Sequence, residues 1–356
     1  MLGSSPEVPG TSLLRKAREE GASDLHLAAG AVPMIRVEGE LRRLAAPPLA
    51  PQEADEILAQ LLAWGGVEAG RDVDFCFERG ELGRFRANAH RHARGAGLSL
   101  KCVPREIPTL EQLGLPDALY ELTELRTGMV LVTGPANCGK SSTLAALLRR
   151  INSTRREHVV TIEDPIEFVF PSEACNVTQR QVGPHTRSFS SALRAALRED
   201  PDVILVSELR DVETIRTAIV AAETGHLVLG TLHTRDAAST VSRLLDVFPA
   251  REQEQVRMMV AASLRSVISQ RLLPRAGGGR RVPAYEILHV TPAVATLIRD
   301  GRTHQIPSQL QIGRRQGMID MDARLEEMVR EGLIDGATAR ASAKSPARFP
   351  EAPRAD

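Results

Sequence analysis

Short apolar runs alternate with helical stretches through the middle of the chain. The runs have the length of strands and cover residues 129–133, 158–162, 203–206 and 226–231. Helical patterns separate them, for example at 190–198 and 212–224. Strands that are apolar throughout are buried on both faces, so this pattern predicts a mainly parallel sheet covered by helices, which is the α/β class.

The first hundred residues follow a different pattern. Segments in which polar and apolar residues alternate, at 34–37, 40–44, 73–77, 84–88 and 98–102, predict antiparallel strands. Two further stretches, at 12–20 and 51–63, fit helices. We therefore expect a small α+β domain over residues 1–105.

Prolines and composition mark the other boundaries. Pro104, Pro108 and Pro116 restrict the backbone and place a linker at 106–117, so the α/β domain covers 118–338. The last third of the chain is expected to be helical, with one helix that begins at Thr291 and Pro292 and ends at Gly301. Residues 339–356 are rich in Ala, Arg, Ser and Pro, and this composition predicts a disordered tail.

A glycine-containing loop follows the first apolar run and precedes an amphipathic helix. Its sequence, GPANCGKS at 134–141, matches the phosphate-binding pattern G-x-x-x-x-G-K-[ST]. In this motif backbone N–H groups surround phosphate oxygens, Lys140 reaches the β- and γ-phosphates, and the Ser141 hydroxyl is a Mg²⁺ ligand. The sequence thus predicts that ATP and Mg²⁺ bind at Gly134, Pro135, Ala136, Asn137, Cys138, Gly139, Lys140, Ser141 and Ser142.

Carboxylates follow two of the other apolar runs. Glu163 comes directly after the run 158–162, and Glu208 follows 203–206. Functional groups gather at the carboxyl ends of parallel strands, so both residues are candidates to bind the Mg²⁺ shell or to polarise the attacking water. Either carboxylate could instead cap the next helix or lie exposed. Two of them after one phosphate loop favour the functional role.

Two histidines, His226 and His233, accompany the last apolar run. A histidine near a nucleotide can hydrogen-bond to the γ-phosphate. Their spacing alone favours histidines that have hydrogen-bond partners in the core. A metal site is not expected, because no third ligand lies at a suitable spacing.

Composition narrows the classes of function. The chain has 45 basic and 45 acidic residues, and aromatic residues make up 3% of it, so neither the charge nor the stacking groups of a nucleic-acid-binding protein are in excess. Its four cysteines, Cys76, Cys102, Cys138 and Cys175, are scattered and predict reduced thiols in a cytoplasmic protein. We expect neither a membrane-spanning segment nor a secretory signal.

Three segments resemble the motifs of one protein family. TIEDPIE at 161–167 is similar to an Asp box, LREDPDVILVSELRD at 197–211 to an atypical Walker B motif, and TGHLVLGTLHT at 224–234 to a His box. Together they resemble the bacterial type II/IV secretion ATPase superfamily. ASDLHL at 22–27 and PMIRVEG at 33–39 resemble its PilT-like branch, the retraction ATPases of type IV pili.

This resemblance implies a fold and an assembly. The N-terminal domain would be PAS-like and the second domain RecA-like, in a homohexamer that hydrolyses ATP to power pilus retraction and twitching motility. The motor would be cytoplasmic, at the inner face of the cytoplasmic membrane, and would act on the platform protein of the pilus. Nucleic acid is not an expected partner.

The resemblance also assigns roles to residues of the second domain. Glu208 would bind Mg²⁺ or activate the water, and Glu163 would orient the water, although the division between them stays open. His226 and His233 would be the His-box residues, with His226 among the catalytic groups.

The N-terminal domain would act on the nucleotide of a neighbouring subunit. Arg86 stands where the family has its first phosphate-neutralising arginine, and Lys101 occupies the second position. Lysine keeps the charge and lacks the bidentate fork of arginine. Arg84 and Arg94 lie nearby in the sequence.

Departures from the family pattern keep an alternative open. The phosphate loop has Ala136, Asn137 and Cys138 where the family prefers Thr-Gly-Ser, and Asn137 is suited to a left-handed backbone. Ser207 replaces a glycine, and the family's retraction motif is present as AVATLIRD at 293–300, without one Arg and the Asn. The alternative is an accessory or hydrolysis-impaired paralogue that assists a main pilus motor.

Overall fold

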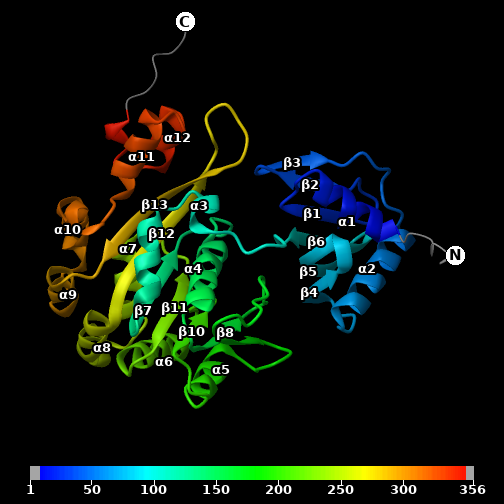
Figure 1. Ribbon diagram of the computed structural model, residues 1–356. Helices are drawn as coiled ribbons and strands as arrows, with labels where there is room; N and C mark the ends of the chain where they lie inside the picture. The colour runs from blue at the N-terminus through cyan, green and yellow to red at the C-terminus, as the bar shows by residue number, and fades with distance from the viewer. Residues whose placement is uncertain (1–8, 350–356) are drawn as a thin grey trace, which may run out of the picture. The chain divides into compact units, whose positions relative to one another are not determined.

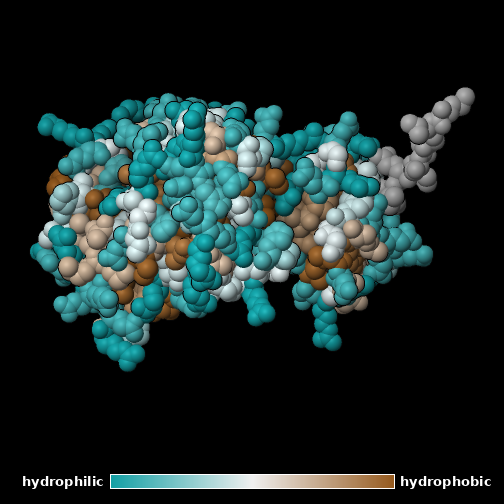
Figure 2. Space-filling model, turned by 60° about the horizontal axis from the view of Figure 1, so that its bottom comes forward, coloured by the Kyte–Doolittle hydropathy of each residue, from teal (hydrophilic) through white to brown (hydrophobic). Residues whose placement is uncertain are grey.

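The computed structural model describes residues 9–349 and divides into two compact units. The first comprises the chain up to Glu106 together with the short segment Pro165–Phe168, and the second comprises Ile107–Asp164 and the chain from Val169 onward. Figure 1 shows the elements of each unit, and Figure 2 shows that hydrophilic side chains cover most of the face in view. Among the described residues no helix has the length and apolar character needed to cross a membrane.

The first unit is built on one antiparallel sheet with the strand order β3-β2-β1-β6-β5-β4. Its elements are α1 (Pro9–Glu19), β1 (Asp24–Ala28), β2 (Met34–Val37), β3 (Glu40–Arg43), α2 (Pro51–Gly65), β4 (Asp72–Arg79), the 3₁₀ turn η1 (Gly80–Leu82), β5 (Gly83–His92) and β6 (Gly95–Cys102). Buried and partly buried residues alternate along β5, because one face of the sheet packs against the helices. Leu61 of α2 and Phe85 of β5 are fully buried in this core.

The second unit contains a seven-stranded sheet with the order β13-β12-β7-β11-β10-β8-β9. All neighbouring strands are parallel except β12 and β13. The strands are β7 (Gly128–Thr133), β8 (His158–Glu163), β9 (Asn176–Gln181), β10 (Val203–Val206), β11 (Leu227–Leu232), β12 (Leu264–Leu273) and β13 (Val282–His289). The predicted fold class, an antiparallel α+β part followed by a mainly parallel α/β part, is confirmed.

Helices cover both faces of this sheet (Figure 1). They are α3 (Leu110–Leu113), η2 (Asp117–Glu124), α4 (Lys140–Thr154), α5 (Phe189–Ala196), α6 (Val212–Glu223), α7 (Ala237–Asp246), α8 (Ala250–Ser263), α9 (Pro292–Arg299), η3 (Thr303–Gln305), α10 (Ile306–Ile312), η4 (Gly313–Gln316), α11 (Met321–Arg330), α12 (Gly336–Ser342) and η5 (Pro346–Arg348). The helices α5, α6 and α8 share one core with the strands. Thr291 caps α9 as predicted, since its side chain accepts a hydrogen bond from the N–H of Val294.

The expectation of a helical last third is wrong in one respect. Two long strands, β12 and β13, lie in this region and complete the edge of the sheet. The strand β12 is buried against β7, and its polar residues Ser266, Ser269 and Gln270 are buried with it. Because these residues have hydrogen-bond partners inside the protein, they interrupt the apolar pattern without interrupting the strand.

The predicted disorder after residue 339 is also wrong as far as the structure describes this segment. The helix α12 extends to Ser342, Ala339 is fully buried, and Phe349 is 5% exposed in a small core with Leu325 and Met328. Both carboxylate oxygens of Asp322 accept backbone N–H groups, from Lys344 and Ser345. These contacts order a segment of low apolar content, whereas residues 350–356 lie outside the described part.

Candidate functional site

The phosphate loop connects β7 to α4, the strand–loop–helix context that its motif requires. Gly134 has φ 142°, and a Cβ atom there would lie 2.2 Å from the carbonyl oxygen of Gln270, so only glycine fits. Gly139 has φ 94° and caps α4. Asn137 has φ 58°, the left-handed backbone predicted for it, so the loop keeps its shape without the family's glycine.

Gln270 supports the loop from β12. Its amide nitrogen donates to the carbonyl oxygen of Cys138 at 2.8 Å, and its amide oxygen accepts from the Thr143 hydroxyl at 2.9 Å. The Gln270 side chain is 3% exposed, so both hydrogen bonds lie in the interior. The sequence analysis gave this residue no role, because its partner Cys138 lies 132 positions earlier in the chain.

Replacing Gln270 by alanine is expected to lower both stability and nucleotide affinity. The change removes the side-chain donor of the Cys138 carbonyl oxygen and leaves the Thr143 hydroxyl with the Gly139 carbonyl oxygen as its acceptor. The loss costs about 1–3 kcal/mol, so the melting temperature should fall by about 2–10 °C. Calorimetry and titration with a fluorescent ATP analogue measure the two effects. Gln311→Ala, at an exposed position, is the matched control. An unchanged affinity would show that Gln270 does not shape the loop.

The cysteine of the loop is a buried, neutral group. Cys138 is 2% exposed, and burial raises the pKa of its thiol even though Lys140 acts in the opposite direction. The thiol therefore stays protonated at neutral pH and serves as packing beneath the loop rather than as a nucleophile.

Lys140, at the start of α4, is 9% exposed and turns toward its own loop. Its ammonium donates to the carbonyl oxygens of Gly134 and Pro135, both at 2.9 Å, and lies 3.4 Å from Nδ1 of His233. Since an ammonium only donates, Nδ1 of His233 is the acceptor, and the proton of the neutral ring belongs on Nε2.

Nε2 of His233 lies 3.1 Å from Oε1 of Glu208. The other oxygen of Glu208 pairs with Arg210 at 2.8 Å. Burial raises the pKa of Glu208, but the hydrogen bond and charge of Arg210, with a smaller effect of His233, outweigh it and lower the pKa below its usual value. The side chains of Lys140, His233 and Glu208 thus form one chain of contacts from the phosphate loop to an ionised carboxylate.

Glu163 ends β8 and is 8% exposed. Its Oε1 accepts hydrogen bonds from the Thr161 hydroxyl at 2.7 Å and from the Gln179 amide at 3.0 Å. These two donors hold the carboxylate in one orientation, as a water-positioning group requires.

Strand register explains why these residues meet. Thr133 pairs with Leu232, and Val206 pairs with both Gly230 and Ile162. Glu163, which ends β8, and the residues that follow the other strands, which include the loop, Glu208 and His233, therefore lie at the carboxyl edge of the sheet.

His226 does not belong to this group. It precedes β11, and its carbonyl oxygen accepts the N–H of Gly128, which begins β7. Six residues of strand, about 20 Å, separate this amino edge from the loop. Nδ1 of His226 lies 2.9 Å from the Ala221 carbonyl oxygen, the core-type partner that spacing favoured. The prediction that His226 is a catalytic residue is therefore wrong for the nucleotide site of its own chain.

The candidate phosphate-neutralising residues lie in the first unit. Arg86 and Lys101 are directly opposite on β5 and β6, and both pair with Oε1 of Glu167, at 3.4 and 3.5 Å. Arg84 donates instead to the carbonyl oxygen of Ile166. Arg94 lies in the turn at the far end of these strands, so it is not an equivalent of Arg86.

The residues at the carboxyl edge fit a Mg²⁺ ion that a nucleotide brings with it. Among residues 9–349 no group of three or more His, Cys, Asp and Glu side chains could hold a metal by itself. Mg²⁺ in nucleotide sites needs only one or two protein oxygens besides phosphates and water. The exposed Ser141 and the ionised Glu208 supply oxygens of this kind.

Comparisons with known proteins show what the whole chain is similar to. The family model described as type II/IV secretion system protein matches residues 80–338. The chain is 48% identical to the type IV pilus retraction ATPase PilT of Pseudomonas aeruginosa, over 95% of this chain and 99% of that protein. It is 46% identical to a twitching motility protein of Neisseria gonorrhoeae, over 94% and 90%. A crystal structure of the pilus retraction motor PilT with bound ADP matches with a TM-score of 0.82 and 43% identity, over 95% of this chain and 97% of that one.

Proposed function

Because the chain belongs to the family of type II/IV secretion system proteins, we propose that it is the ATPase motor that retracts a type IV pilus and so drives twitching motility. It is an ATP hydrolase of the phosphate-loop class. The observation that carries the proposal is the chain of contacts from Lys140 through His233 to Glu208, which joins the phosphate loop to an ionised carboxylate.

ATP binds with its phosphates against the loop and the N-terminus of α4, where N–H groups and the helix dipole favour anions. Lys140 exchanges the carbonyl oxygens of Gly134 and Pro135 for phosphate oxygens. Water then attacks the γ-phosphorus, the bond to the bridging oxygen breaks, and ADP and inorganic phosphate form. Glu208 polarises this water and Glu163 orients it.

Mg²⁺ would be held by Ser141 and Glu208 together with the phosphates, and it supplies charge neutralisation for the phosphoryl group. The working form is a homohexamer in which Arg86 and Lys101 of one subunit neutralise phosphate charge at a neighbour's nucleotide. Their pairing with Glu167 gives them an alternative partner when they do not contact phosphate. The proposed domains are 1–105, the linker 106–117 and 118–338.

The hydrolysis cycle would move the first unit against the second and turn the platform protein of the pilus. A motor that acts on the platform protein in this way works in the cytoplasm, at the inner face of the cytoplasmic membrane. The parallel sheet provides the rigid base, and the linker absorbs the backbone change.

Complementation tests this function. We expect the purified chain to hydrolyse ATP and to restore twitching to a Pseudomonas aeruginosa strain that lacks PilT. A chain that hydrolyses ATP but restores twitching only beside another retraction ATPase would be the accessory paralogue. No hydrolysis by the purified hexamer would exclude the motor function.

A further inference from the structure

A second charged site lies in the first unit, apart from the phosphate loop. A cavity of about 810 Å³ is formed by the last turns of α1, the turn between β4 and β5, and the residue Arg105 after β6. We call it the arginine pocket. Its charged lining consists of four arginines and two glutamates, namely Arg15, Arg18, Arg79, Arg105, Glu19 and Glu81.

Arg18 is fixed at the centre of this lining. Its Nε donates to the carbonyl oxygen of Leu82 at 3.0 Å and its Nη2 to that of Arg84 at 2.6 Å. The guanidinium also lies over the ring of Phe85, 4.5 Å from the ring centroid. These three contacts prevent Arg18 from turning away into solvent.

Arg105 lies against the same place. A Cβ atom built on Gly83 would be 3.3 Å from Nη2 of Arg18 and 3.3 Å from Nε of Arg105, so both guanidinium groups lie at one point beside this glycine. Burial lowers the pKa of Arg18, and the like charge of Arg105 lowers it further. Among residues 9–349 no carboxylate forms an ion pair with Arg18, Arg79 or Arg105.

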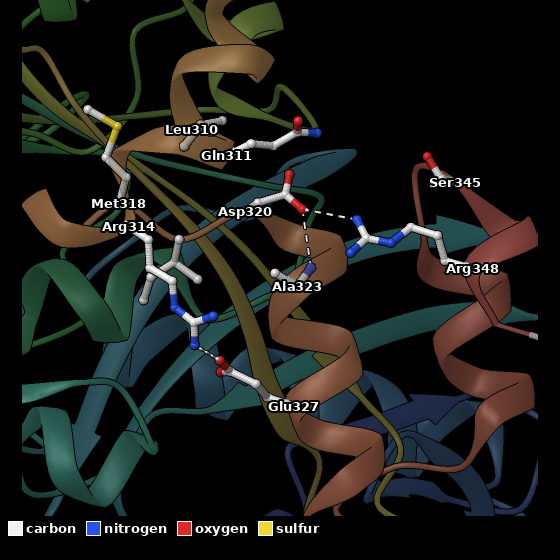
Figure 3. Close-up of a pocket in the computed structure, with 10 residues that line it drawn as sticks. Leu310, Gln311, Arg314, Met318, Asp320, Ala323, Glu327, Ser345 and Arg348 are labelled. Carbon is white, nitrogen blue, oxygen red and sulfur yellow. Dashed lines mark hydrogen bonds and ion pairs between the residues drawn. The ribbon is translucent and has the colours of Figure 1, made fainter.

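The cavity of Figure 3, in the second unit, provides a contrast. There Arg314 pairs with Glu327 at 2.8 Å, and Arg348 lies 3.7 Å from Asp320. The arginines of that cavity are neutralised by carboxylates of the protein itself. In the arginine pocket the like charges of Arg18 and Arg105 instead lie close together, an arrangement that a bound anion would stabilise.

We propose that the arginine pocket binds a phosphate-bearing anion with at least two negative charges. Guanidinium forks match the oxygens of phosphate in geometry as well as charge, and a ligand that spans Arg18 and Arg105 gains a hydrogen bond from each. The cavity has the size of sites for small organic ligands, so it admits more than a single phosphate. A free phosphate compound and the head group of an anionic lipid both offer this chemistry.

The test uses the full chain with Lys140→Ala in every sample, so that any binding at the phosphate loop is the same throughout. Inorganic pyrophosphate, without divalent cations, is titrated calorimetrically, and vesicles of phosphatidylglycerol or phosphatidylcholine are used for sedimentation. We expect saturable binding of pyrophosphate, at least tenfold weaker after Arg105→Gln. Arg105 is exposed, and its side chain donates no hydrogen bond to a backbone carbonyl oxygen within residues 9–349, so this variant keeps the fold. Arg18→Gln, in contrast, loses two carbonyl contacts.

The matched control is Arg314→Gln, an arginine of the other cavity, which should leave pyrophosphate binding unchanged. Weak pyrophosphate binding together with sedimentation on phosphatidylglycerol that depends on Arg105 would identify a lipid head group as the source. The proposal is overturned if neither probe binds, or if both bind the Arg105→Gln chain as well as they bind the parent.

Discussion

Lys140→Ala should reduce the rate of ATP hydrolysis by about a thousandfold while the chain keeps its fold. The ammonium of Lys140 is the positive group nearest the phosphates, and charged groups that stabilise the transition state of phosphoryl transfer contribute factors of about 10³ or more. The fold should persist because Pro135 is exposed, so water can replace the ammonium at its carbonyl oxygen, and because Gln270 supports the loop independently of Lys140.

Steady-state phosphate release by the purified protein measures this loss, with circular dichroism to verify the fold. Lys16→Ala, at an exposed lysine of α1, is the matched control and should retain full activity. If Lys140→Ala kept more than a tenth of the parent rate, hydrolysis would not depend on the phosphate loop. If the parent bound ATP normally but was as slow as the variant, the hydrolysis-impaired alternative would hold.

The sequence predicted the local parts of this site well. A phosphate loop is contiguous, and its glycines and lysine are needed at fixed positions, so the motif located it without any knowledge of the fold. Glu163 and Glu208 could be found because they follow apolar strands, and parallel strands bring their carboxyl ends to one edge.

The contacts that join these parts could not be predicted in the same way. Gln270 contacts Cys138 and Thr143, which only the folded chain brings near. Arg210 lies inside the 197–211 motif, but the motif does not show that its guanidinium pairs with Glu208. The two histidines show the limit most clearly. His226 and His233 lie at opposite ends of β11, so one strand places one of them in the site and removes the other from it.

The fold, too, was predictable where the pattern is local and was not predictable where polar residues depend on distant partners. The strands β7, β8, β10 and β11 are apolar and were predicted from their pattern, whereas β12 carries Ser266, Ser269 and Gln270 in its buried part. Hydrogen bonds to Leu288, Thr133 and Thr143 satisfy these polar groups. A sequence pattern records polarity but not whether a partner is present, so a strand of this kind is not recognised before the fold is known.

Glu208→Gln should lower the rate of ATP hydrolysis by about 10²–10⁴, the range for loss of a positioned general base, with nucleotide affinity little changed. Glutamine is neutral and cannot accept from both Arg210 and His233 in the way the carboxylate does, because one of its two polar atoms is a donor. The variant therefore loses both the charge that polarises water and one of the contacts that hold His233 beside Lys140. Single-turnover hydrolysis and equilibrium binding of ATP separate the two effects.

The pH dependence gives this prediction a second, independent measurement. The pKa of Glu208 lies below the usual value of a glutamate in the folded chain, so its contribution to stability is present above the pKa of the unfolded chain and is lost as the pH falls through the lower, folded pKa. The stability of Glu208→Gln towards acid should therefore lack this contribution. The surface variant Glu213→Gln, whose side chain is 57% exposed, should match the parent in the rate of ATP hydrolysis. A Glu208→Gln chain with the parent's hydrolysis rate would assign water activation to Glu163 instead, since Glu163 also lies at this edge of the sheet.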